Sequence, residues 1–133
     1  MRLTLSAFFF GVFLALATVA GVGIAAAETV QASGSFVGAS NHVTTGGVSI
    51  VKAADGSVSV VLADDFSLDG APDPRVGLGK DGTYDPKSDL GVLANNTGAQ
   101  TYSLPAGLDA SAYNEVYIWC KKFSVPLGVA AIK

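Results

Sequence analysis

The residue of this chain best suited to chemistry is Cys120, its only cysteine. It ends an apolar run over residues 116–120, in which strand alternation places Val116, Ile118 and Cys120 on one face. Two lysines follow, and the same alternation predicts Lys122 on the side of the thiol, where positive charge favours the thiolate. Two interpretations stay open: a redox thiol or ligand to a metal or haem, and a small buried hydrophobic residue.

His42, the only histidine, is the candidate companion of the thiol. An imidazole beside a cysteine can activate it or complete a metal or haem site, provided that the fold brings the two together. A lone histidine is otherwise a hydrogen-bonding residue of a loop or core. Loop aspartates offer oxygen ligands for calcium, but their spacing fits no EF-hand, so no metal site is predicted.

Several reaction classes lack their motifs. The sequence has no CxxC or CxxCH, which excludes thioredoxin-like chemistry and covalent attachment of c-type haem. No Ser/His/Asp arrangement or dinucleotide fingerprint is recognisable, so a hydrolase is a distant third interpretation and enzymatic activity stays open. Beyond residues 121–122 there is no run of basic residues, and nucleic-acid binding is therefore not expected.

The first 27 residues have the layout of a secretory signal peptide. A basic start at Arg2 precedes an apolar stretch over residues 3–24 and three alanines, which predicts cleavage after Ala27. Residues 28–133 would then form the mature domain, with a net charge of −4, in the periplasm, at the cell surface or in the medium. The alternative is an uncleaved membrane anchor, because the apolar stretch is long enough to span a bilayer.

The mature part is predicted to be all-β. Residues 48–52 and 58–62 are β-rich runs joined through Asp55 and Gly56, a strong hairpin signal. Residues 28–35 and 80–88 indicate connecting segments, whereas residues 108–113 indicate one helical turn capped by Asp109. About seven or eight short strands with regular turn signals predict a single-domain antiparallel β-sandwich or a small open barrel. Because both faces of residues 116–120 are apolar, this strand should be central.

A family resemblance rests on several short segments in a fixed order. These are Phe36, His42, Gly47-Val48-Ser49-Ile50, Asp55-Gly56, Asp65-Phe66, Asp69-Gly70-Ala71-Pro72-Asp73, Val76, Leu90-Gly91-Val92-Leu93, residues 98–105, residues 113–120, Phe123-Ser124-Val125 and Gly128-Val129-Ala130. Together they resemble the DM-thirteen domain, described as a possible electron-transfer domain. That family accompanies DOMON domains in animal cell-surface proteins and occurs in exported bacterial proteins.

The resemblance implies a role for the cysteine. It makes Cys120 the redox centre, either as a bare thiol or as the holder of a prosthetic group such as haem, with His42 as a companion beside the Lys122 that strand alternation suggests. Other exported or cell-surface redox proteins would be the partners. The alternative function is a non-catalytic extracytoplasmic binding module, in which Cys120 is only a core residue.

Overall fold

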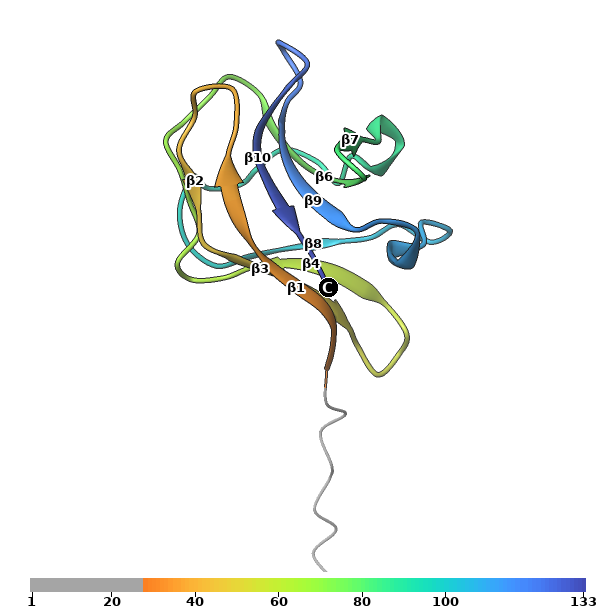
Figure 1. The fold of residues 1–133 in the computed structure, drawn as a ribbon. Helices are drawn as coiled ribbons and strands as arrows, with labels where there is room; N and C mark the ends of the chain where they lie inside the picture. Colours follow the sequence, from red (N-terminus) through yellow and green to blue (C-terminus); the bar gives the residue numbers. More distant parts are fainter. Residues whose placement is uncertain (1–27) are drawn as a thin grey trace, which may run out of the picture.

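The computed structural model describes residues 28–133, and the predicted signal peptide lies outside them. The described chain is all-β, with one curled sheet of eight antiparallel strands and a second sheet of two strands (Figure 1). In chain order the strands are β1 (Thr29–Gly38), β2 (Thr44–Thr45), β3 (Gly47–Lys52), β4 (Val58–Leu62), β5 (Ser67–Leu68), β6 (Pro74–Lys80), β7 (Thr83–Tyr84), β8 (Gln100–Ser103), β9 (Glu115–Cys120) and β10 (Val125–Ala131). Short 3₁₀ helices cover Pro86–Ser88 (η1) and Ala110–Ala112 (η2).

The strand order of the large sheet is β7-β6-β9-β10-β1-β3-β4-β8. The sheet curls into a half-barrel. The all-β prediction is therefore confirmed, and of the two predicted architectures the open barrel is closer than a sandwich of two large sheets. The small sheet pairs β2 with β5. Within residues 28–133, no helix is long and apolar enough to cross a bilayer.

Local turn chemistry explains the strands that the sequence predicts best. The hairpin of β3 and β4 pairs Val48 with Leu62 and Lys52 with Val58, and Gly56 supplies the positive φ of 87° in its turn. The side chain of Asp109 caps η2 by accepting from Ser111 N at 2.9 Å, as predicted.

Two predicted connections are wrong. Residues 29–35 belong to β1, where they pair with β3, because small residues fit this crowded part of the sheet. At Gly34, for example, a Cβ would lie 1.9 Å from the carbonyl oxygen of Ala131. Residues 80–88 contain β7 and η1, which form because the β6–β7 turn returns the chain along the edge of the sheet.

The C-terminal end of the described chain lies beside the middle of β1. Ser33 N donates to Lys133 O at 3.0 Å, and Lys133 N donates to Ser33 O at 3.1 Å. The opposite end of the half-barrel carries the β9–β10 turn, residues 121–124 (Figure 1).

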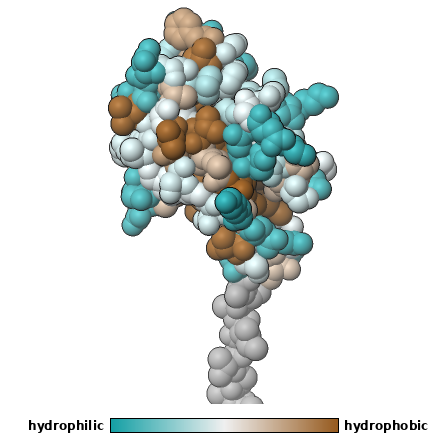
Figure 2. Space-filling model, in the orientation of Figure 1, coloured by the Kyte–Doolittle hydropathy of each residue, from teal (hydrophilic) through white to brown (hydrophobic). Residues whose placement is uncertain are grey.

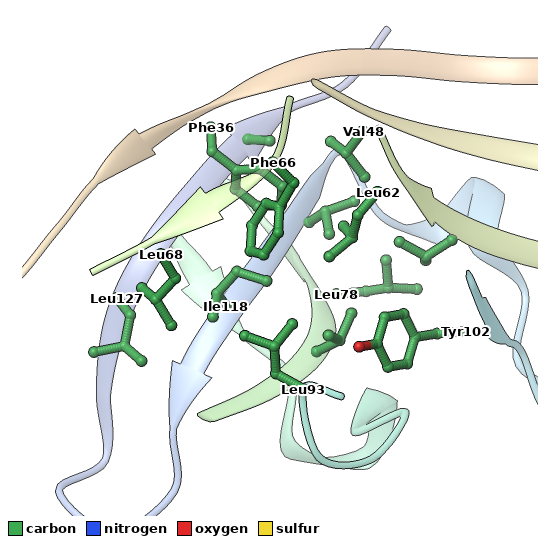
Figure 3. Packing of buried hydrophobic residues seen from close by; sticks show 14 of the residues in the cluster. Phe36, Val48, Leu62, Phe66, Leu68, Leu78, Leu93, Tyr102, Ile118 and Leu127 are labelled. Carbon is green, nitrogen blue, oxygen red and sulfur yellow. The ribbon is translucent and has the colours of Figure 1, made fainter. Parts of the chain in front are cut away.

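The concave side of the sheet holds the core (Figure 3). Phe36 on β1 and Phe66 pack edge to face with ring centroids 5.5 Å apart, and Leu62, Leu78 and Ile118 are fully buried around them. Each such side chain contributes roughly 1.5–3 kcal/mol on burial. The outer surface is mainly hydrophilic, with separate exposed apolar side chains on the face that Figure 2 shows.

One buried hydroxyl connects η1 to the sheet. Ser88 is fully buried, and its Oγ accepts from Leu78 N at 2.7 Å. The single hydrogen of this hydroxyl is shared between two carbonyl oxygens, Asp85 O at 2.6 Å and Leu78 O at 2.9 Å. Ser88 thus satisfies Leu78 N, which the edge of β6 would otherwise leave unpaired away from water.

We expect Ser88→Ala to lower the free energy of unfolding by about 1–3 kcal/mol, because Leu78 N would lose its partner inside the protein. Urea denaturation followed by circular dichroism measures this loss. Ser103→Ala, on the exposed side of the edge strand β8, is the matched control and should change stability by less than about 0.5 kcal/mol. Equal stabilities of the two variants would contradict this account of Ser88.

Candidate functional site

Cys120 is buried at the end of the central strand β9. It pairs with Pro74 of β6 on one side and Val125 of β10 on the other, and it is 1% exposed. Its side chain lies in the core with Val116 and Ile118, on the face that strand alternation predicts. The Sγ–H group donates to the carbonyl oxygen of Pro72 at 3.1 Å.

The segment over the sulfur is the connection between β5 and β6, residues 69–73, here called the cover loop. Pro72 is itself exposed, although its carbonyl oxygen bonds to the buried thiol. At this point a single segment of backbone, the cover loop, therefore separates the sulfur from solvent.

The first end of the cover loop is held by Asp69. One carboxylate oxygen lies 2.9 Å from His42 Nδ1, and the other accepts from Val43 N at 3.0 Å. Asp69 N also donates to Val43 O at 3.1 Å. The hydrogen bond from Val43 N, followed by that from His42, lowers the pKa of the Asp69 carboxyl, so the fastening persists at neutral pH.

The second end of the cover loop is held at Asp73. Its carbonyl oxygen accepts from Lys121 N at 3.1 Å, and its carboxylate lies 2.9 Å from Arg75 Nε. Asp73 has a positive φ of 47°, a conformation that aspartate tolerates better than most residues. The loop is thus fixed on both sides of the Pro72 carbonyl by polar contacts, and Ala71 between them packs against the core.

The two predicted companions do not touch the thiol directly. His42 bonds to Asp69 of the cover loop. Pro72, three residues further along this loop, accepts the hydrogen bond from Cys120, so the loop connects the histidine to the cysteine. Lys122 lies in the exposed β9–β10 turn, with its Nζ 5.5 Å from the ring centroid of Phe123. The prediction that Lys122 shares the face of Cys120 is wrong, because the strand ends at Cys120.

A haem or metal centre does not fit Cys120 in this arrangement. The sulfur is enclosed by core side chains and by Pro72 O, and it lines neither of the two surface grooves described for residues 28–133. In the same part of the chain, no three His, Cys, Asp or Glu side chains gather as a metal site.

Sequence reasoning missed Asp69 and Pro72 as parts of this site. Their segment reads as a turn because of its proline, glycine and aspartate residues. The segments that carry the family resemblance include residues 69–73, and this was the one sign that the turn could belong to the site. Nothing local indicates that this turn covers a cysteine 48 positions later in the chain.

Comparison with known proteins finds a family model that covers the cover loop and Cys120 together. A family model described as "Electron transfer DM13" matches residues 35–132, which include β1 from Ser35 onward, the cover loop and Cys120. No curated protein matches the chain, and no solved structure matches it.

We expect Asp69→Ala to raise the alkylation rate of Cys120 in the folded domain roughly fivefold, because the first end of the cover loop loses its two side-chain contacts and keeps only the backbone hydrogen bond to Val43. Iodoacetamide labelling followed by mass spectrometry gives the rate. Asp109→Ala is the matched control, since Asp109 is also an exposed turn-capping aspartate but belongs to η2.

The measurement is made well below the urea midpoint of each variant, so that global unfolding does not contribute. Equal rates for Asp69→Ala and Asp109→Ala would show that the cover loop does not control access to the sulfur.

Proposed function

Because the chain belongs to the DM13 family of electron-transfer domains, we propose that it is an exported domain that donates electrons through the thiol of Cys120. The observation that carries the proposal is the position of this thiol under a thin loop fastened by exposed polar contacts. Such a cover keeps the sulfur out of water in the resting state and exposes it by a local motion.

The chemistry follows from the presence of a single cysteine. An internal disulfide cannot form, so the sulfur must bond to another molecule when it is oxidised. In the proposed step, the Cys120 thiol loses its proton to water, and the thiolate attacks a disulfide of a partner protein. A mixed disulfide forms, and the second sulfur of the partner leaves as a thiolate, so that the bonding electron pair of the broken disulfide departs with it.

The cover loop gives this reaction a resting state. While Pro72 O accepts the thiol hydrogen, the sulfur is protonated and enclosed, and buried thiols of this kind are inert. Displacement of residues 69–73 breaks that hydrogen bond and opens the sulfur to the partner. His42 then acts as a positioning residue through Asp69, and it is not required to touch the reacting sulfur.

The partners are inferred from the compartment. Export is supported by the signal-like residues 1–27, and disulfides persist in oxidising extracytoplasmic compartments. An exported or cell-surface redox protein with an accessible disulfide fits this chemistry. A free haem is not proposed, because Cys120 offers it no open face.

A second candidate function is a non-catalytic binding module. The 1% exposure of Cys120 and its aliphatic neighbours Val116, Ile118 and Val125 favour this alternative, since free cysteine is often a core residue. Here Cys120→Ala would lower stability but leave binding intact. Under the redox proposal, the same variant loses mixed-disulfide formation.

The deciding experiment compares disulfide exchange with global unfolding in the domain of residues 28–133. We expect oxidised glutathione to form one mixed disulfide per chain at least tenfold faster than the domain unfolds globally, because only the cover loop has to open. Asp69→Ala should accelerate the exchange further, and Cys120→Ala should abolish it.

The unfolding rate comes from stopped-flow denaturation extrapolated to water, and the adduct is counted by intact-mass spectrometry. An exchange rate equal to the global unfolding rate would assign Cys120 to the core alone and favour the binding module.

A further inference from the structure

The outer face of the sheet carries an aromatic cluster that the core does not require. Tyr117 and Trp119 leave β9 on the face opposite to Cys120, and Tyr84 leaves β7. The rings of Tyr84 and Trp119 are stacked, with centroids 4.3 Å apart and planes 12° apart. Tyr117 lies edge-on to Trp119 at 6.4 Å and tilted to Tyr84 at 5.6 Å.

Two glycines of β6 make room for this cluster. A Cβ at Gly77 would lie 2.5 Å from Tyr84 Cε2, and a Cβ at Gly79 would lie 2.4 Å from Tyr117 Cε2. Glycine inside a strand weakens it, so its presence at two alternate positions indicates that close approach of the rings is required there. The sheet is thus shaped to hold the rings of Tyr84 and Tyr117 against β6.

A groove of about 500 Å³ lies beside these rings. Tyr84, Tyr117 and Trp119 line one part of it, and Pro126 and Val129 of β10 line another. Trp119 and Tyr84 are half-buried, so part of each ring remains open to a ligand. The size is within the range of small-molecule sites, which combine apolar walls with few polar groups.

The charge around the groove is negative. Among residues 28–133, Glu115 is the only charged residue that lines it, and one of its carboxylate oxygens accepts from Gly82 N at 2.7 Å. Burial, followed by the charge of Asp89, raises the pKa of Tyr84 to about 12, whereas Arg75 acts in the opposite direction. Arg75 itself is held by Asp73 at 2.9 Å and Asp89 at 3.7 Å, which neutralises it.

We propose that this groove binds a quaternary ammonium group, such as the trimethylammonium head of choline. The negative faces of aromatic rings attract weakly hydrated cations, tryptophan most strongly, and Glu115 adds a full negative charge. Pro126 and Val129 provide apolar contact for the methyl groups. The site lies on the face of β9 opposite to the thiol, so it does not depend on redox chemistry at Cys120.

A neutral sugar is the competing ligand, because sugars also stack on tryptophan. A sugar would bring no charge to the groove, whereas the described residues that line it include the carboxylate of Glu115 and no Lys or Arg to neutralise it. The charge complementarity therefore favours the cation.

The test uses the fluorescence of Trp119, the only tryptophan of the chain. Choline is titrated into the domain and compared with dimethylbutanol, its neutral carbon isostere. We expect a saturable change of emission with choline, and binding at least tenfold weaker for the isostere, because the cation–π attraction is lost. Equal affinity for both, or a response to glucose and not to choline, would overturn the proposal.

Matched variants connect the response to the groove. Glu115→Gln should weaken choline binding about fivefold, and Tyr84→Ala about tenfold. Glu28→Gln removes the other glutamate of the chain, and Phe123→Ala removes an exposed ring at the β9–β10 turn, so both should bind choline as the wild type does. Unchanged affinity in folded Glu115→Gln and Tyr84→Ala, verified by circular dichroism, would also overturn the proposal.

A final comparison identifies the source of the ammonium group. Phosphatidylcholine vesicles are titrated against phosphatidylglycerol vesicles while Trp119 emission is followed. A response to free choline alone supports a soluble ligand, and a further response to phosphatidylcholine supports a lipid headgroup. A response to phosphatidylglycerol vesicles but not to choline or phosphatidylcholine would count against cation recognition.

Discussion

The pairing of β9 between β6 and β10 is the constraint on which both proposed sites depend. Its register sets Cys120 opposite Pro74 and Val125, and Trp119 opposite Arg75 and Pro126. A shift of one residue would turn every side chain of β9 to the other face of the sheet. Burial of Val116 and Ile118 in the core prevents this shift, and so it fixes the thiol inside and the indole outside.

The sequence predicts well what local patterns determine. Alternation identifies β9 and the inner position of Cys120, and the Asp55-Gly56 turn identifies the β3–β4 hairpin. Both depend on residues within one strand or one turn, which is where propensity and periodicity carry information. The curl of the large sheet into a half-barrel depends on all eight strands, and the pattern left it undecided between two architectures.

Contacts between distant segments could not be predicted in this way. The prediction for Lys122 failed because side chains alternate between the two faces only within a strand, and β9 ends at Cys120. The position of this end is set by the turn to β10. His42 has Asp69 as its partner, 27 positions away, and one histidine among many loop aspartates gives no sign of which it will meet. The packing of Tyr84 over Gly77 likewise depends on the pairing of β7 with β6, which the sequence does not indicate.

The hydrogen bonds between Ser33 and Lys133 have a consequence for how the domain meets its surroundings. They hold Lys133 beside β1, and both this end and the first residues of β1 lie away from the pole of the half-barrel that carries the β9–β10 turn (Figure 1). A tether attached at either end would therefore orient the molecule in the same way. The pole that carries Lys121, Phe123 and the cover loop would point away from the attachment, towards whatever molecule approaches from the far side.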